Sequence, residues 1–263
     1  MILVSGAVAL LILNGLFMAR LLILSSAQSV IAKAPTLTFL AYILTLLCIW
    51  AIYKCSVSDP GYVPQSLSKM TVRNYCNNCK APKPERAHHC RCCNRCVHRM
   101  DHHCVWINNC VGYKNQKLFI LFLTYLVILG GYDCVLICYH SFTSFSIHGL
   151  PSLAMTLVMF IFFALNLGTA IYAGIYLREQ LESVETNTTL VETYQGTRGD
   201  PEANVFVQLF GERKFLWFLP VDSSLPPNYY EGVLGTEKLR PLDADILGVS
   251  NDYKQVRDID KID

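Results

Sequence analysis

Four long runs of apolar residues, poor in charge, constrain this chain more than any other feature. Hydrophobic residues make up 52% of its 263 positions, which is high for a soluble domain. The runs cover residues 2–24, 36–53, 118–139 and 152–177. Each is close to the roughly 20 residues that an α-helix needs to cross the hydrocarbon of a bilayer. The sequence therefore predicts an all-α polytopic membrane protein with four transmembrane helices.

The distribution of basic residues predicts the orientation of these helices. Residues 54–117 hold 11 of the 22 Lys and Arg residues, whereas residues 25–35 hold only Lys33 and residues 141–151 hold none. Cytosolic loops of membrane proteins carry the excess of Lys and Arg. We therefore expect the loop and both termini to lie in the cytosol. The expected membrane is that of the Golgi, the endoplasmic reticulum or the plasma membrane, and the charge distribution does not choose among them.

This orientation predicts four segments. They are the first two transmembrane helices (1–53), a cytosolic cysteine-rich zinc domain (54–117), the last two transmembrane helices (118–177) and a cytosolic C-terminal tail (178–263). Within the helices, Arg20 and Asp133 are costly in a bilayer unless paired, and we expect them to pair with each other. No internal repeat and no nucleic-acid-binding signature is found.

Cysteine and histidine are concentrated in the predicted loop. Eight of the 12 cysteines and five of the seven histidines lie between Cys76 and Cys110. A disulfide framework and a zinc domain both explain such clustering, but the reducing cytosol disfavours disulfides, and pairs spaced C-x2-C are typical of structural zinc sites. Six cysteines with this kind of spacing, together with two histidines, would fill two tetrahedral sites: Cys76, Cys79, Cys90, Cys93, Cys96 and Cys110.

Two cysteines, Cys92 and Cys104, are left over by this assignment. Cys92 lies between the two cysteines of the pair Cys90-x2-Cys93 and is interpreted as a spare thiol. Cys104 follows Asp101 and His102. His102 supplies a base, and Asp101 supplies a carboxylate that orients the base, which is the arrangement that activates a cysteine nucleophile. The alternative is that Asp101, His102 and His103 only flank a structural zinc site and have no catalytic role.

Four stretches of this loop resemble the cysteine-rich domain of the DHHC family of protein S-acyltransferases. They are Tyr75-Cys76-x2-Cys79, Lys83-Pro84-Glu85-Arg86-Ala87-His88-His89-Cys90, Asp101-His102-His103-Cys104 and Trp106-Ile107-Asn108-Asn109-Cys110-Val111-Gly112. In addition, Asp59-Pro60-Gly61 after the second helix is similar to the family's DPG motif. The resemblance extends over residues 1–220.

The resemblance implies the role of each residue in the loop. It assigns Cys76, Cys79, His89 and Cys96 to one structural Zn²⁺, and Cys90, Cys93, His103 and Cys110 to a second. It makes Cys104 the acylated nucleophile, His102 its base and Asp101 the partner that orients the base. Sequence spacing alone does not choose this pairing.

The chain departs from the family pattern at three places. Val105 stands where the family usually has Pro after the nucleophile. The TTxE motif near the fourth helix is present as Thr188-Thr189-Leu190-Val191-Glu192, with one extra residue. The C-terminal motif is only echoed, by Asn204, Phe206, Phe210 and Gly211.

The implied activity is transfer of a long-chain acyl group from acyl-CoA, through acyl-Cys104, to cysteine thiols of protein substrates at the cytosolic face of the bilayer. Trp106 is expected beside the thioester. Basic residues of the loop are expected to hold the CoA phosphates, with Lys83 and Arg86 as the named candidates. Asp59, Thr188 and Thr189 are expected to support the site.

Two alternatives come from other classes of protein. A membrane-bound RING-like ubiquitin ligase also binds two zinc ions through eight ligands, but it needs no surplus nucleophile such as Cys104. A non-catalytic, membrane-anchored zinc scaffold on the same fold is favoured only by Val105. Autoacylation of the purified protein separates the enzyme from both alternatives.

Overall fold

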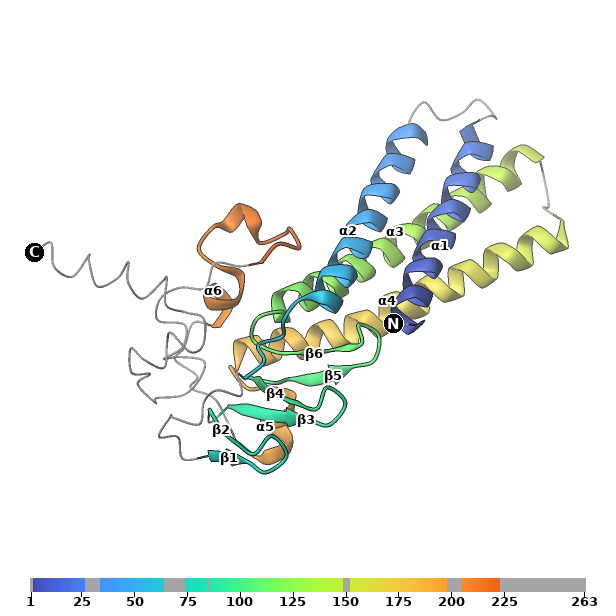
Figure 1. Ribbon diagram of the computed structural model, residues 1–263. Coiled ribbons are helices and arrows are strands. Elements are labelled where there is room, and N and C mark those ends of the chain that lie inside the picture. Colours follow the sequence, from blue (N-terminus) through green and yellow to red (C-terminus); the bar gives the residue numbers. More distant parts are fainter. Residues whose placement is uncertain are drawn as a thin grey trace, which may run out of the picture. The chain divides into compact units, whose positions relative to one another are not determined.

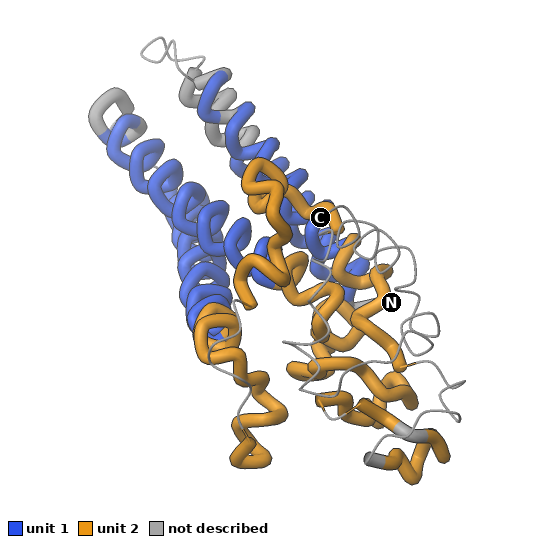
Figure 2. The backbone as a smooth tube through the Cα atoms, turned by 90° about the vertical axis from the view of Figure 1, so that its left-hand side faces the viewer, with its two compact units in different colours: residues 1–53, 120–179 blue, residues 54–119, 180–263 orange. Residues whose placement is uncertain are grey.

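The computed structural model describes residues 2–26, 34–63, 74–84, 86–148, 152–197 and 205–222. Its elements, labelled in Figure 1, are α1 (Ile2–Ser26), α2 (Ala34–Val57), β1 (Asn74–Cys76), β2 (Ala81–Lys83), β3 (Ala87–Cys90), β4 (Arg95–His98), β5 (His102–Cys104), β6 (Asn109–Val111), α3 (Gln116–His148), α4 (Leu153–Glu185), α5 (Leu190–Gln195), α6 (Val205–Phe210) and the 3₁₀ turn η2 (Lys214–Leu216). The chain divides into two compact units, shown in Figure 2. Unit 1 comprises residues 1–53 and 120–179, and unit 2 comprises residues 54–119 and 180–263.

The long helices identify a membrane protein. Among the described residues, three helical segments are long and apolar enough to cross a bilayer: Phe39–Val57, Gln116–Thr143 and Leu153–Glu185. In α1 the described apolar segment is the shorter Val4–Met18. The first of the four predicted spans therefore stays a prediction.

Helices α3 and α4 are longer than the apolar runs that predicted them. Each has 33 residues, which corresponds to about 50 Å at 1.5 Å per residue and exceeds the hydrocarbon thickness of about 30 Å. The apolar run ends at residue 177, but Leu, Arg, Glu and Gln follow it in α4. These residues are strong helix formers, so the helix continues after hydrophobicity stops.

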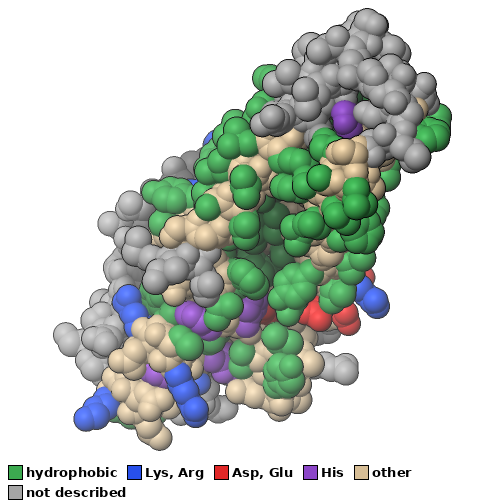
Figure 3. Space-filling view, turned by 90° about the vertical axis from the view of Figure 1, so that its right-hand side faces the viewer, with side chains coloured by type: hydrophobic (Ala, Val, Ile, Leu, Met, Phe, Trp, Pro, Cys, Tyr) green, Lys and Arg blue, Asp and Glu red, His purple; other side chains and the backbone are tan. Residues whose placement is uncertain are grey.

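Unit 1 packs its helices through apolar side chains. The rings of Phe17 and Phe162 stack with their centroids 3.6 Å apart, and the Tyr132 hydroxyl donates a hydrogen bond to the Leu37 carbonyl at 2.9 Å. A buried core cluster consists of Met18, Leu136, Ile137 and Met159. Hydrophobic side chains also cover much of the outer face in Figure 3, as expected of helices whose solvent is lipid.

A small polar cluster connects three helices of unit 1. Asn14 of α1 donates to the Asp133 carboxylate of α3 at 2.6 Å, and Asn166 of α4 donates to the Asn14 side-chain oxygen at 3.0 Å. Asp133 thus has Asn14 as a described partner. The predicted pairing of Asp133 with Arg20 lies outside the described residues, because the side chain of Arg20 is among those not described.

Unit 2 contains three antiparallel β-hairpins, β1–β2, β3–β4 and β5–β6, which follow one another in Figure 1. The prediction of an all-α chain was wrong for this part of the chain, which is mostly helical elsewhere. Each strand has only three or four residues, too few for an alternating hydrophobic pattern to show. Five buried strand residues are cysteines, and only two described ones, Val97 and Val111, are buried and β-branched.

The predicted DPG element forms the tight turn by which the chain leaves α2. The Asp59 carboxylate accepts hydrogen bonds from the backbone N–H groups of Gly61 and Tyr62, both at 2.8 Å, and from Lys114 at 3.0 Å. Gly61 has φ 104°, which favours glycine, and the ring of Tyr113 occupies the space that a side chain there would need.

The segment after residue 204 is attached to the start of α3. Lys117 is buried and donates to the carbonyls of Leu216 and Val221 at 3.0 and 3.1 Å. Phe206 packs edge-on against the Trp217 ring at 5.0 Å. Of the C-terminal family motif, Asn204 lies outside the described residues, whereas Phe206 and its neighbours in α6 are described.

Candidate functional site

Two groups of three cysteines and one histidine form the metal-binding part of the site. They match the two predicted ligand sets: Cys76, Cys79, His89 and Cys96 in one group, and Cys90, Cys93, His103 and Cys110 in the other. The ligand atoms of each group all lie within 4.8 Å of one another. Tetrahedral bonds of about 2.3 Å place neighbouring ligand sulfurs about 3.8 Å apart, so both groups are compatible with zinc.

The hairpins explain how ligands far apart in sequence meet. In β3–β4, His89 stands opposite Cys96, and in β5–β6, His103 stands opposite Cys110. Cross-strand pairs of this kind have side chains on the same face of the hairpin. The remaining two cysteines of each group come from the preceding hairpin, one from the end of its first strand and one from its turn. Each metal group therefore joins two consecutive hairpins.

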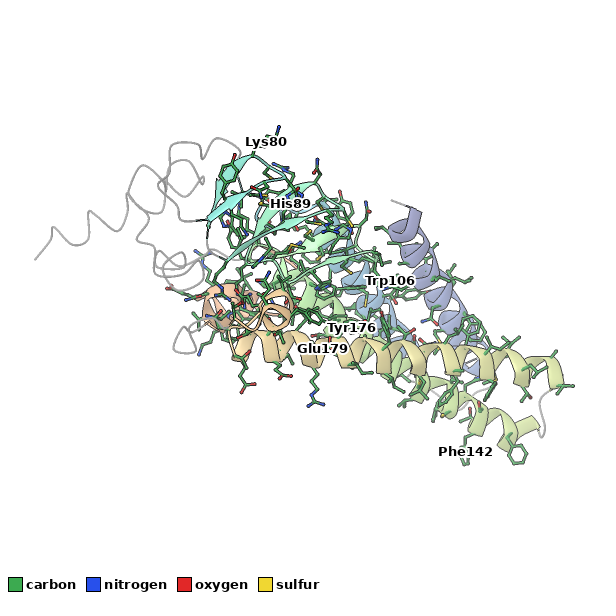
Figure 4. All side chains as sticks on the ribbon, turned by 90° about the horizontal axis from the view of Figure 1, so that it is seen from below. Lys80, His89, Trp106, Phe142, Tyr176 and Glu179 are labelled. Atoms are coloured by element: carbon green, nitrogen blue, oxygen red, sulfur yellow. The ribbon has the colours of Figure 1, made fainter. Side chains whose placement is uncertain are left out.

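Distances within the groups agree with this arrangement. The Cys79 sulfur lies 3.2 Å from His89 Nδ1 and 3.7 Å from the Cys96 sulfur. In the second group the Cys93 sulfur lies 3.3 Å from His103 Nδ1 and 3.5 Å from the Cys110 sulfur. The first of these histidines, His89, is labelled in Figure 4.

Cys104 belongs to neither metal group and lies beside His102. His102 Nδ1 donates to the Asp101 carboxylate at 2.7 Å, and the imidazole also interacts with the Cys104 thiol. Burial opposes the charge on His102, but the bonds to Asp101 and Cys104 raise its pKa to about 9. Burial opposes the thiolate of Cys104 too, yet His102 and the backbone N–H groups of Ile107 and Trp106 lower its pKa. The arrangement favours a thiolate–imidazolium pair at neutral pH.

Asp101 accepts hydrogen bonds from residues distant in sequence as well as from His102. Its side chain is 1% exposed, and its carboxylate also accepts hydrogen bonds from the Gln180 side chain at 2.8 Å and from the backbone N–H of Leu190 at 2.9 Å. Burial alone would raise the pKa of this carboxyl, but the bonds from His102, Leu190 and Gln180 lower it. Asp101 is therefore an ionised group with a fixed orientation.

A chain of buried amides ends at this carboxylate. The Gln116 side chain donates to the Gln180 side-chain oxygen at 3.1 Å, and Arg99 donates to the Gln116 side-chain oxygen. Hydrogen bonds then run in one direction from the Arg99 guanidinium to Asp101, and such chains strengthen one another through polarisation. Gln116 and Gln180 were not predicted from the sequence, because they lie in helices with no motif around them.

Arg86, predicted to hold acyl-CoA phosphates, is hydrogen-bonded within the protein in this structure. It is buried and donates to both carboxylate oxygens of Glu192, at 2.6 and 2.7 Å, and to the side chain and backbone carbonyl of Asn187. These partners occupy donors of the guanidinium that the predicted contact with phosphate would need. Arg99, also basic, is 1% exposed and is likewise occupied.

The TTxE-like element is the start of α5. The Thr189 side chain caps the helix by accepting from the Glu192 backbone N–H at 3.3 Å, while the Glu192 carboxylate accepts from the Thr189 N–H at 2.8 Å. This is a capping box, which requires Thr and Glu three residues apart. The capping box consists of Thr189 and Glu192. Thr188 lies outside the box and donates a hydrogen bond to the Thr186 carbonyl.

The remaining predicted residues lie at the surface of unit 2. Trp106, labelled in Figure 4, lies in the turn after β5 and is 49% exposed. Lys83 donates to the Ala87 carbonyl at 2.7 Å. Lys80, Arg91 and Arg95 are exposed, and Arg95 stacks on the Tyr62 ring.

The comparisons agree with this geometry. Residues 69–197 match a family model described as DHHC palmitoyltransferase. The chain is 32% identical over 242 residues to "Probable protein S-acyltransferase 15" of Arabidopsis thaliana, covering 86% of this chain and 92% of that protein. It is also 30% identical over 219 residues to "Probable protein S-acyltransferase 12" of the same plant, covering 73% and 75%. "Palmitoyltransferase ZDHHC2" of Homo sapiens is 35% identical over 165 residues, covering 57% of this chain and 44% of that protein.

Proposed function

The chain belongs to the DHHC palmitoyltransferase family, and we propose that it carries the acyl group on Cys104 during protein S-acylation. The observation that carries this proposal is a cysteine, Cys104, that belongs to neither Cys/His group and interacts with His102, whose ring is hydrogen-bonded to Asp101. A cysteine outside the metal sites, with a base and an orienting carboxylate, is suited to nucleophilic catalysis. The zinc-scaffold and RING-like alternatives are not favoured.

The proposed reaction has two steps. The Cys104 thiolate attacks the carbonyl of an acyl-CoA thioester, the bond from carbonyl carbon to CoA sulfur breaks, and the departing CoA thiolate takes the proton held by His102. A cysteine thiol of the protein substrate then gives its proton to His102 and attacks acyl-Cys104, which releases Cys104 as a thiolate. One thioester replaces another in each step, so the exchange is close to energetically neutral.

The two metal groups support this site by holding the backbone around it. The proposed Zn²⁺ ions would be held by the eight cysteine and histidine ligands, with all four positions filled by protein, so they supply folding energy and no open coordination position. Because His103 is a ligand of one group while its neighbours His102 and Cys104 are not, the metal would fix the β5 backbone that carries both.

Acyl-CoA and membrane-proximal cysteines of protein substrates are the proposed reactants. Lys83 and the exposed residues Lys80, Arg91 and Arg95 are candidates for contacts with the CoA phosphates, now without Arg86. Exposed Trp106 is a candidate for contact with the bound acyl thioester, since indole rings favour the membrane–water interface.

Cys104→Ser is the test of the nucleophile, and Cys92→Ser is its matched control. Cys92 is an exposed cysteine of the same unit that belongs to neither metal group. The purified Cys104→Ser variant should lose hydroxylamine-sensitive autoacylation and keep two zinc ions per chain, whereas Cys92→Ser should keep both. Autoacylation that survives in Cys104→Ser would refute the proposal.

We further propose four spans with unit 2 and both termini in the cytosol, supported by the 11 basic residues in 54–117 and their scarcity in the other loops. The sequon Asn187-Thr188-Thr189 is a poor reporter of this topology, because Asn187 is 1% exposed and bonded to Arg86. A glycosylation tag fused after Asp263 should stay unmodified, and one inserted within residues 27–33 should be glycosylated. The opposite pattern would invert the topology.

A further inference from the structure

The three β-hairpins of unit 2 repeat one design with a period of 14 residues. In each, a cysteine ends the first strand and a four-residue turn follows; these cysteines are Cys76, Cys90 and Cys104. The last turn residue has nearly the same positive φ in every hairpin: 51° at Lys80, 51° at Asn94 and 50° at Asn108. The prediction of no internal repeat was wrong, because the hairpins share few positions other than the ligands.

The repeat places the nucleophile at a position that holds metal in the other two hairpins. Each turn points backbone N–H groups at the sulfur of its first cysteine. The Cys79 N–H donates to the Cys76 sulfur at 3.4 Å, and the Cys93 N–H donates to the Cys90 sulfur at 3.3 Å. In the third hairpin the backbone N–H groups of Ile107 and Trp106 lie close enough to the Cys104 sulfur to lower the pKa of its thiol.

The hairpins differ three residues after the cysteine that ends the first strand, at the last position of the C-x2-C pair. Cys79 and Cys93 supply a second sulfur there, and the third hairpin has Ile107, whose side chain is fully buried. Adding 14 to the numbers of the other two ligands of the second group leads from His103 to Lys117 and from Cys110 to Thr124. Neither residue is a metal ligand of the kind used by these groups, so the third hairpin lacks three of the four ligands of its relatives.

Even so, the third hairpin is close to a metal site of another kind. Cys104 offers a thiolate, and His102 offers a ring nitrogen whose partner nitrogen is hydrogen-bonded to Asp101. A histidine oriented by a carboxylate is the usual second-sphere arrangement of metal-bound histidine. One further sulfur would give Cys₂His, the ligand set of catalytic zinc sites that keep an open fourth position.

We propose that Ile107 keeps the nucleophile free of metal by denying the third hairpin its second knuckle sulfur. This proposal rests on the proposed role of Cys104. If the two neighbouring groups take up zinc, the metal also reaches the surroundings of Cys104, and a thiolate bound to zinc would be a poorer and less accessible nucleophile. The aliphatic side chain at position 107 thus distinguishes the hairpin that carries the nucleophile from the two hairpins that supply metal ligands. The backbone N–H of residue 107 still lies near the sulfur of Cys104.

Ile107→Cys tests the proposal in the full-length protein, with Ile107→Ala as the matched control, since alanine creates at least as large a cavity without a sulfur. After purification with zinc present, Ile107→Cys should hold three metal ions per chain rather than two, and its autoacylation should fall at least tenfold. Brief chelation that removes only the third ion should restore acylation. Ile107→Ala should hold two ions and acylate within a few-fold of the unchanged protein.

A second variant identifies the ligand. Ile107→Cys combined with Cys104→Ser should return to two metal ions, because the new site needs both sulfurs. Two ions in Ile107→Cys itself, or three in the double variant, would overturn the proposal, as would an equal loss of acylation in Ile107→Ala. The metal count does not depend on catalysis, so failure of Cys104 as the acylated residue would show only as autoacylation in Cys104→Ser.

Discussion

The two units of this protein treat buried polar groups in opposite ways. Among described residues, unit 1 buries one carboxylate, Asp133, and gives it a neutral partner, Asn14. Unit 2 buries several charged groups and assembles them into networks, namely Arg86, Arg99, Asp101, Lys117 and Glu192. The contrast follows from what surrounds each unit and from what each must position.

Helices in a bilayer gain little from hiding apolar side chains, because lipid is as apolar as a protein core. Helix α4 accordingly leaves large side chains such as Leu157, Phe160 and Leu165 exposed. The core clusters around the strands of unit 2 are small and include the cysteines of the metal groups. Metal ligands and buried hydrogen bonds are directional, so they also place Asp101, His102 and Cys104 accurately.

Loss of a metal ligand in unit 2 should have the largest effect. Cys93→Ser removes one of four ligands from the second group, and structural zinc contributes on the order of 10 kcal/mol or more to folding. We expect loss of metal, of cooperative unfolding and of all autoacylation, measured by elemental analysis and calorimetry. Cys92→Ser, the adjacent substitution, should change none of these. A Cys93→Ser protein that keeps two zinc ions would show that the ligand set is wrong.

The buried ion pair should come next. Arg86→Met leaves Glu192 buried without its partner, and breaking a buried pair in this way costs about 3–5 kcal/mol. The matched control is Lys114→Met at the half-exposed Lys114–Asp59 pair, where a loss of about 1 kcal/mol or less is expected. Denaturant unfolding measures both. Equal effects of the two substitutions would mean that burial does not distinguish these pairs.

Removal of the amide that holds Asp101 should affect activity more than stability. Gln180→Met keeps the length of the side chain and removes the donor to the carboxylate. A hydrogen bond to a charged group contributes about 1.5–3 kcal/mol, so autoacylation should slow roughly tenfold or more with little change in the acyl-CoA concentration for half-maximal rate. Glu182→Gln, on the exposed side of the same helix, is the control. A changed acyl-CoA dependence with an unchanged maximal rate would remove Gln180 from the positioning network.

The polar cluster of unit 1 should have the smallest effect. Asp133→Asn keeps the shape of the side chain and one acceptor for the Asn14 amide. Hydrogen bonds between transmembrane helices average about 0.6 kcal/mol, so unfolding in detergent should shift by about that amount and autoacylation should persist. A loss comparable to that of Arg86→Met would show that this carboxylate has a role beyond connecting helices.

Much of the site could be predicted because its chemistry is written in local spacing. The C-x2-C pairs, the Asp101-His102-His103-Cys104 stretch and the apolar runs each depend on residues close in sequence. The structure brought together the eight predicted ligands and left Cys104 outside them. By contrast, the β-hairpins were missed because strands of three residues show no period, and their 14-residue repeat was missed because Ile107 and Lys117 interrupt it.

The sequence by itself determined the apolar helices, the two ligand sets through their family resemblance, and the pairing of a base with a nucleophile. Only the tertiary structure decided which polar groups are occupied. Arg86 and Lys80 are both basic residues of one loop, but Arg86 lies 106 positions before the carboxylate that neutralises it, and Lys80 remains exposed. Gln180 likewise reaches Asp101 across 79 positions. Charge and hydrogen-bonding capacity are properties of a residue, whereas burial and partnership depend on which distant segments fold against it.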